Sequence, residues 1–147
     1  MSDTRIDREQ WSQSSKQSYE YELCSEGSYG DLHYNCAKCG AAAVFTAEEQ
    51  KHSFEVKKND IRQQRIHCPA CNAELFRLRT RERACQARWS ADRKTLARDE
   101  AFLREWLGIL VAIPRYAPRY RNSMGDRLAR LLLRLGLEME SRSHDSA

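Results

Sequence analysis

The sequence predicts an α+β fold in which a small metal-stabilised module is followed by a helical hairpin. Two Cys-x-x-Cys pairs, Cys36 with Cys39 and Cys68 with Cys71, point to a metal site. Short apolar runs flank the first pair, and apolar residues recur at helical intervals in the last third. We therefore expect a flexible polar arm over residues 1–20, a metal-binding module over 21–89 and a two-helix extension over 90–147.

Composition makes a metal useful to this chain. Of the 147 residues 31% are charged and the mean hydropathy is −0.79, so few apolar side chains are available for a large core. The longest apolar run covers residues 106–113 and is far shorter than the roughly 20 residues that cross a bilayer. The N-terminus is charged and has no apolar leader segment. We expect a cytoplasmic protein without a membrane partner, whose thiols bind metal or stay free.

The elements around the cysteines follow from local patterns. Residues 32–35 and 42–45 are expected to form strands of a hairpin whose turn holds the first pair. Thr46 and Glu49 form a capping box, which predicts a helix over 47–56 with Phe54 and Val56 facing inward. Residues 61–67 are extended and lead to the second pair. A helix follows from Cys71 towards Cys85, through Leu75, Phe76 and Leu78.

The last third predicts two helices. Ser90 is a plausible cap for the first, which Pro114 ends. Its apolar face consists of Leu96, Leu103, Trp106, Leu107, Leu110 and Ile113. Ser123 and Asp126 begin the second helix. Its apolar stripe consists of Leu128, Leu131, Leu132, Leu135 and Met139.

The two cysteine pairs together predict one structural Zn²⁺. In each pair the two-residue gap lets one tight turn aim both sulfurs at the same point, and two such turns make a tetrahedral site with Zn–S bonds of about 2.3 Å. A hairpin turn that supplies two ligands and a helix start that supplies two is the layout of a treble clef or zinc ribbon. Binding of such a metal contributes roughly 10 to 16 kcal/mol to folding.

Other readings of the cysteines are less favoured. Unrelated thiol pairs, a redox Cys-x-x-Cys or an iron–sulfur cluster would use the same residue type. His33 and His67 lie beside the ligands and are alternative metal ligands, but with four thiolates present we expect both to be ordinary strand side chains. Cys24 and Cys85 have no Cys-x-x-Cys partner and are expected to be free thiols. Four thiolates leave no open coordination position, and the His-x-Glu of zinc deaminases is absent, so we expect no enzymatic activity.

The segments around the two pairs resemble a bacterial family described as probable zinc-ribbon (treble-clef) domain proteins. The resemblance rests on Tyr34 to Gly40, Val44 to Gln50, Phe54 to Val56 and Arg65 to Cys71, and covers about residues 32–80. The phrase Phe-Thr-x-x-Glu-Gln between the pairs is its most specific part. The resemblance implies metal binding by the same four cysteines and names no activity. The family usually has arginine after the last cysteine, whereas Asn72 and Ala73 follow Cys71 here.

Two functions are open at this point. The favoured one is a protein-interaction or adaptor module, in which the C-terminal helices present Trp106 and a leucine face to a partner or to a second copy. Leu133 and Leu137 lie off the main stripe, which indicates a last helix that is apolar on more than one side.

The alternative is nucleic-acid or ribonucleoprotein binding through a basic surface. Arg77, Arg79, Arg81 and Arg83 alternate along one segment, and Pro-Arg-Tyr occurs twice between the last two helices. The candidate contacts are Arg77, Arg81, Arg115, Tyr116, Arg119, Tyr120 and Arg121. Residues 1–35 carry three Lys or Arg against seven Asp or Glu, whereas the rest of the chain is basic, which favours an anionic partner. Charge of mixed sign on this scale is also typical of an ordinary solvated surface.

Overall fold

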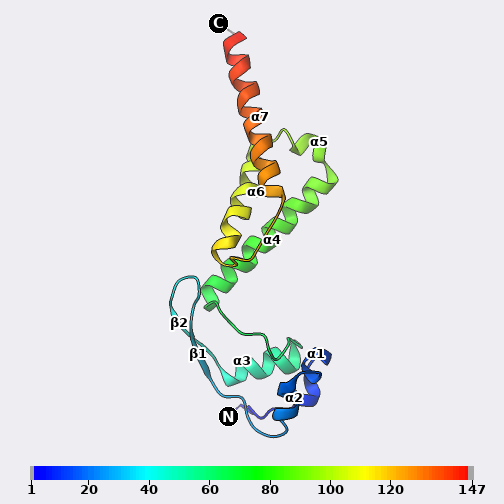
Figure 1. Ribbon diagram of the computed structural model, residues 1–147, viewed down its shortest axis with the longest axis vertical. Helices are drawn as coiled ribbons and strands as arrows, with labels where there is room; N and C mark the ends of the chain where they lie inside the picture. Colours follow the sequence, from blue (N-terminus) through cyan, green and yellow to red (C-terminus); the bar gives the residue numbers. More distant parts are fainter. Residues whose placement is uncertain (1, 146–147) are drawn as a thin grey trace. The chain divides into compact units, whose positions relative to one another are not determined.

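The computed structural model describes residues 2–145 (Figure 1). The chain divides into two compact units, and the boundary in the sequence lies between Pro69 and Ala70. Each unit has its own hydrophobic cluster. The division falls in the first turn of helix α4 (Pro69–Ala91) and not at the predicted boundary between residues 89 and 90. The reason is that α4 contributes four side chains to the core of the second unit: Leu75, Leu78, Cys85 and Trp89.

The first unit contains the predicted hairpin and helix. Strand β1 (Leu32–Asn35) pairs with β2 (Ala42–Phe45) in antiparallel register. Thr46 caps α3 (Ala47–Lys51) by accepting a hydrogen bond from Glu49 N at 3.2 Å, and α3 continues into the π-helical turn η2 (His52–Val56). Phe54 is buried as predicted, but Val56 points to solvent and is 65% exposed.

The N-terminal segment differs from the flexible arm that we predicted. It forms the short helices η1 (Arg8–Gln10), α1 (Gln13–Lys16) and α2 (Tyr19–Leu23). Trp11 is only 3% exposed and packs in one cluster with Tyr29, Phe45 and Phe54. Residues 1–20 lack a regular apolar period, but burial of one large aromatic ring orders the segment around it.

Glu55 anchors this segment to the rest of the unit. One oxygen of its buried carboxylate accepts hydrogen bonds from Asp7 N at 2.7 Å and from the Tyr29 hydroxyl at 3.1 Å. The other oxygen forms an ion pair with Lys51 at 3.0 Å. The Tyr29 hydroxyl in turn accepts from Trp11 Nε1 at 2.8 Å. Burial raises the pKa of Tyr29, so it stays a neutral donor to Glu55. A buried carboxylate with this many partners fixes one arrangement of the chain segments around it.

The second unit is helical and has a larger core. After α4 come α5 (Arg93–Leu96), α6 (Glu100–Ala112), the 3-10 turn η3 (Ile113–Arg115) and α7 (Met124–Asp145). Helices α6 and α7 pack together, as predicted for the C-terminal hairpin. α4 adds a third long helix to the same hydrophobic cluster. The most deeply buried apolar residues are Leu103, Trp106, Ile113 and Leu128.

The helix predicted through Leu75, Phe76 and Leu78 is present as α4, and Phe76 lies on its exposed side because the buried positions follow a spacing of three and four from Leu75. Two other details of the predicted helices are wrong. The N-cap residues of α5 and α6 are Asp92 and Asp99, because Ser90 lies inside the longer α4. Met139 is 62% exposed because α7 runs on past the helices that cover its first half (Figure 1).

The buried face of α4 includes Glu82, although glutamate is usually found on the surface. One of its carboxylate oxygens accepts hydrogen bonds from Gln86 Nε2 at 2.7 Å and from Trp106 Nε1 at 3.3 Å. The carboxylate therefore accepts the hydrogen bond of the indole N–H of the most buried aromatic residue in the core.

No helix in the described part of the chain has an apolar stretch that would cross a membrane.

Substitution of Trp11 tests whether the N-terminal segment belongs to the folded unit. Trp11→Ala removes a buried ring and the hydrogen bond to Tyr29, and should lower the free energy of unfolding by about 3 to 5 kcal/mol. Tyr19→Ala is the matched control, because this aromatic side chain from the same segment is 69% exposed. Chemical denaturation followed by tryptophan fluorescence and circular dichroism would measure both. Equal stability of the two variants would contradict an ordered segment.

Candidate metal centre

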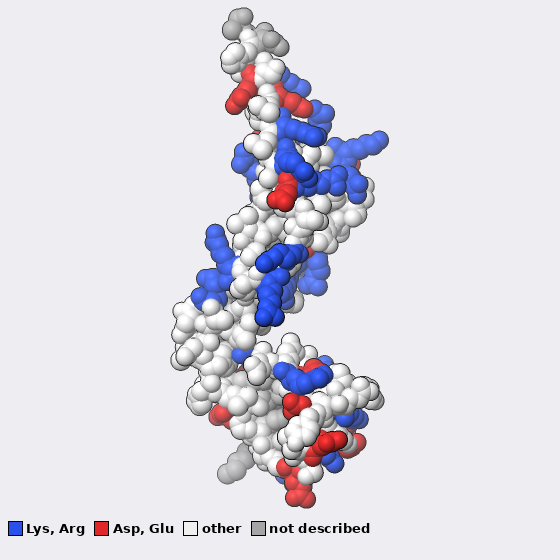
Figure 2. Space-filling view, in the orientation of Figure 1, with Lys and Arg blue, Asp and Glu red and all other residues white. Residues whose placement is uncertain are grey.

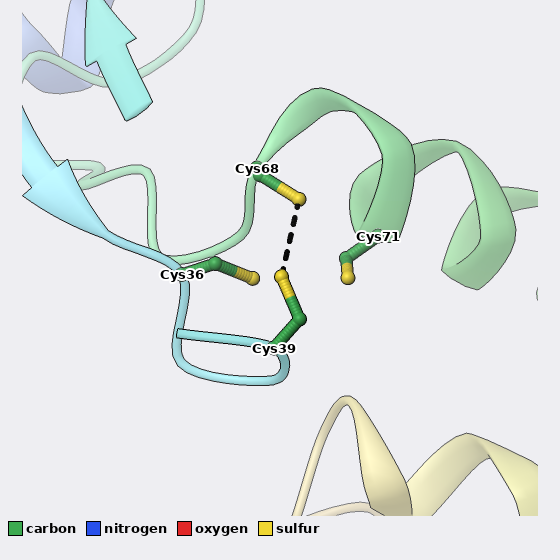
Figure 3. A group of neighbouring side chains, drawn as sticks. All are labelled: Cys36, Cys39, Cys68 and Cys71. Carbon is green, nitrogen blue, oxygen red and sulfur yellow. Dashed lines mark hydrogen bonds between the residues drawn. The ribbon is translucent and has the colours of Figure 1, made fainter. Parts of the chain in front are cut away.

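Four cysteines that are distant in the sequence converge at one point. The sulfurs of Cys36, Cys39, Cys68 and Cys71 all lie within 4.8 Å of one another (Figure 3). Sγ of Cys39 and Sγ of Cys68 are 3.7 Å apart. A disulfide would require about 2.05 Å, so the sulfurs are arranged around a shared centre and are not bonded to each other.

The first pair sits in a tight turn at the end of β1. Gly40 N donates a hydrogen bond to Cys36 O at 2.9 Å, and Cys36 N donates to Ala41 O at 2.8 Å, so the turn closes on itself. Gly40 adopts φ of +76°, a conformation that residues with a Cβ rarely take. This closed turn brings the two sulfurs of the pair to the same point.

The second pair begins a helix. Cys68 immediately precedes Pro69, the first residue of α4, and Cys71 lies in its first turn. Proline is well tolerated here, since the first helical N–H has no intrahelical partner. The remaining free N–H groups and the helix dipole favour negative charge at this end, which stabilises thiolate sulfur.

The segment before Cys68 is joined to the hairpin by two hydrogen bonds. Ala37 N donates to Ile66 O at 2.7 Å, and the Tyr34 hydroxyl donates to His67 O at 2.8 Å. Arg65 makes further contacts between this segment and the elements before it. Its guanidinium stacks over the Phe45 ring at 4.0 Å and forms an ion pair with Glu49 at 2.5 Å. These contacts place Cys68 next to the first pair through geometry that does not depend on the sulfurs.

The environment of Cys36 favours its ionised form. Burial by itself favours the neutral thiol, but backbone N–H groups of Cys39, Cys68 and Lys38 act in the opposite direction and lower the pKa of Cys36 to about 5. A thiolate is the form that binds a metal.

The donor set fits Zn²⁺. Zn–S bonds of about 2.3 Å in a tetrahedron give sulfur–sulfur separations of about 3.8 Å, close to the 3.7 Å between Cys39 and Cys68. Cys36 and Cys68 are buried, Cys71 is half-buried and Cys39 is exposed. Four thiolates complete the coordination shell, so a zinc ion held here has a structural role and no position for substrate.

The other candidate ligands lie outside this group. Among the described residues neither His33 nor His67 joins the four sulfurs. The His33 side chain is exposed on β1 opposite Val44, while His67 contributes its backbone carbonyl to Tyr34. Cys24 packs at the edge of the aromatic cluster of the first unit. Cys85 is in the core of the second, where burial raises the pKa of its thiol.

Most of the basic and tyrosine residues that we predicted for nucleic acid make contacts within the protein. Arg77 pairs with Glu74 at 2.7 Å and Arg81 with Glu105 at 3.5 Å. Arg121 donates to two backbone carbonyls of its own loop. Tyr116 and Tyr120 are half-buried against the helical core.

The remaining arginines of that prediction differ from these. Arg79, Arg83, Arg115 and Arg119 take part in none of the ion pairs formed by the described residues. All four of these arginines are exposed. The predicted set of arginines and tyrosines is therefore divided between side chains that are held by the fold and side chains that extend into solvent.

A different group of arginines, which the sequence pattern did not predict, lies on the second unit. Arg93 and Arg127 lie over the Trp89 ring at 5.8 and 5.5 Å, and Arg88 lies over Phe102 at 4.7 Å. Trp89 and Phe102 themselves stack, with an interplanar angle of 5°. These arginines come from three different helices, so no local pattern links them.

Replacing a ligand tests the metal centre. Cys36→Ser should abolish stoichiometric zinc and unfold the hairpin region, because metal binding contributes roughly 10 to 16 kcal/mol in small modules of this kind. Elemental analysis after dialysis and thermal melting by circular dichroism would report both effects.

The control for that substitution is Cys24→Ser, which removes a thiol outside the cluster and should keep one zinc per chain. A Cys36→Ser protein with full zinc content and the wild-type melting temperature would refute the site. So would wild-type protein purified without chelator that carries no stoichiometric metal.

Comparison with known proteins agrees with this geometry. No curated protein and no solved structure matches the chain. Residues 30–78 match the family described as "Probable treble clef domain". This stretch contains the hairpin, both Cys-x-x-Cys pairs and the first turns of α4, and about two thirds of the chain lies outside it. Residues 30–78 thus form a zinc-binding treble clef domain with a four-cysteine cluster.

Proposed function

We propose that the protein is a non-enzymatic interaction module, in which structural zinc stabilises the treble clef and the outer face of α7 binds a protein partner. The observation that carries this proposal is the exposure of Leu133 and Leu137, which are 69% and 65% accessible. They lie on the face of α7 opposite Leu128, which is completely buried. A helix with apolar residues on both faces fits one that packs on its own core and also on a partner.

The chemistry of the metal centre is consistent with a role in binding. A catalytic zinc usually has three protein ligands and one open position, and this cluster supplies four thiolates. The two buried carboxylates of the described chain, Glu55 and Glu82, are each held by hydrogen bonds to neighbouring side chains. Such partners hold each carboxylate in place within its own core, which fits a structural role for both.

Affinity capture from extracts of the native host tests the interaction role. Tagged wild-type protein should retain a defined protein set after nuclease treatment. Replacing both exposed leucines, Leu133→Gln with Leu137→Gln, should remove that set, since an apolar contact would become polar. Val111→Gln is the matched control, because Val111 is a 55% exposed aliphatic residue on α6. Retention of the same set by the leucine variant would contradict the proposal.

A second candidate function is binding to single-stranded nucleic acid, and the three arginines around Trp89 and Phe102 favour it. The second unit carries 16 Lys or Arg against 10 Asp or Glu, whereas residues 1–69 carry 9 against 11. Figure 2 shows blue side chains spread over the helices of the second unit. Arg88, Arg93 and Arg127 take part in none of the ion pairs formed by the described residues. A guanidinium stacked on a ring keeps its N–H edge available for phosphate.

Salt dependence of binding to a single-stranded oligonucleotide tests this candidate. Removal of one arginine that binds a phosphate should reduce the slope of log K against log salt by about 0.7. Arg88→Gln with Arg127→Gln should therefore lower the slope by about 1.4. Arg77→Gln with Arg104→Gln removes the same charge from arginines that are already paired with glutamate, and should change the slope less. Equal slopes for the two variants would rule out a specific contribution from this cluster.

A further inference from the structure

The outer face of α7 carries charged residues on both sides of Leu133 and Leu137, in a regular order. Its residues follow each other at intervals of four and three, which is the heptad spacing of paired helices. Along the helix they are Asp126, Arg130, Leu133, Leu137, Glu140 and His144. Two leucines therefore occupy the centre, a cation lies on one side of them and an anion on the other.

None of these side chains packs in the core of the chain's own fold. All six are exposed, and the core-facing side of α7 is formed instead by Leu128, Leu131, Leu132 and Leu135. Arg130 and Glu140 take part in none of the ion pairs of the described residues. Their charges are therefore available to a partner.

The pattern is complementary to itself when two copies of the helix run in opposite directions. If Leu133 of one copy lies opposite Leu137 of the other, the same register places Arg130 opposite Glu140. The outermost pair is then Asp126 with His144. Each pair occurs twice, as the two-fold symmetry of an isologous dimer requires.

A parallel arrangement would not be complementary. In register it would place Arg130 beside Arg130 and Glu140 beside Glu140, and like charges in contact destabilise an interface. Charge therefore selects both the direction of the helices and their register, while the four leucines of the two copies supply the apolar centre.

We infer that the partner of this face is a second copy of the chain, bound through α7 in an antiparallel pair centred between Leu133 and Leu137. This inference rests on the proposed use of the same face for protein binding and adds the identity of the partner. Each chain contributes only two leucines to this contact, so the dimer is weak and its population rises with protein concentration.

Charge reversal tests the inference by sedimentation equilibrium. Wild-type protein should shift from monomer to dimer as its concentration rises. Arg130→Glu alone and Glu140→Arg alone should each weaken the dimer by about tenfold or more, because two opposite-charge pairs become two like-charge pairs. The double variant with both changes should recover wild-type affinity. A mixture of the two single variants should form heterodimers more strongly than either forms homodimers, since each supplies the charge that the other lacks.

The control is Arg134→Glu, which changes the same charge on α7 one helical turn from Arg130 at a position outside the six-residue pattern. It should weaken the dimer much less. Helix content by circular dichroism and zinc content are measured for every variant, so that loss of folding is not read as loss of pairing.

Two results would overturn the inference. One is a monomer at every concentration, and the other is a dimer that the charge reversals leave unchanged or that the double variant does not recover. If the protein is monomeric but Leu133→Gln with Leu137→Gln still removes a different captured protein, the identity of the partner is wrong and the interaction role of α7 remains. If the leucine variant changes neither dimerisation nor capture, the proposed function fails as well.

Discussion

Convergence of four cysteine sulfurs is the constraint on which the treble clef depends. A two-stranded hairpin with mostly exposed residues, a short helix and a long extended connection offer little apolar surface to each other. Zinc coordination supplies stabilisation that such a small assembly cannot obtain from burial. The backbone prepares the site through the Gly40 turn, the Ala37–Ile66 hydrogen bond and the start of α4 at Pro69. Without thiolates at these positions, these hydrogen bonds and the contacts of Arg65 would be left to join the hairpin to the segment before α4.

The rest of the first unit compensates for the small size of the domain in another way. Trp11 and Tyr29, which precede residues 30–78, complete an aromatic cluster with Phe45 and Phe54 from the domain itself. Tyr29 packs on Phe54 with ring centroids 6.1 Å apart, and Phe54 packs on Phe45 at 5.9 Å. Glu55 fixes the polar edge of this cluster by receiving hydrogen bonds from the N-terminal segment and from Tyr29. The metal and the aromatic cluster thus stabilise different parts of the hairpin and helix.

The second unit uses conventional helix packing, and its charges lie on the surface around it. Stacked arginines cover the rim of the core at Trp89 and Phe102, so the same side chains shield apolar rings and present N–H groups to solvent. α7 is the element with two roles. Its inner leucines close the core, and its outer face combines leucines with charges whose order is complementary about the middle of the helix.

The sequence by itself determined the parts of this protein that depend on spacing along the chain. These are the four ligands, the hairpin and capped helix between them, and the apolar stripe of α6, because two-residue gaps, capping residues and helical periods are local properties. Only the tertiary structure decided the rest. Trp11 orders the N-terminal segment by packing with Tyr29, Phe45 and Phe54, which lie later in the chain. Glu82 occupies a core position because the indole N–H of Trp106, 24 residues away, needs a hydrogen-bond acceptor. The arginines around Trp89 and Phe102 likewise come from three helices. Such contacts join residues without a fixed separation in sequence, so their free energy appears only when the chain has folded.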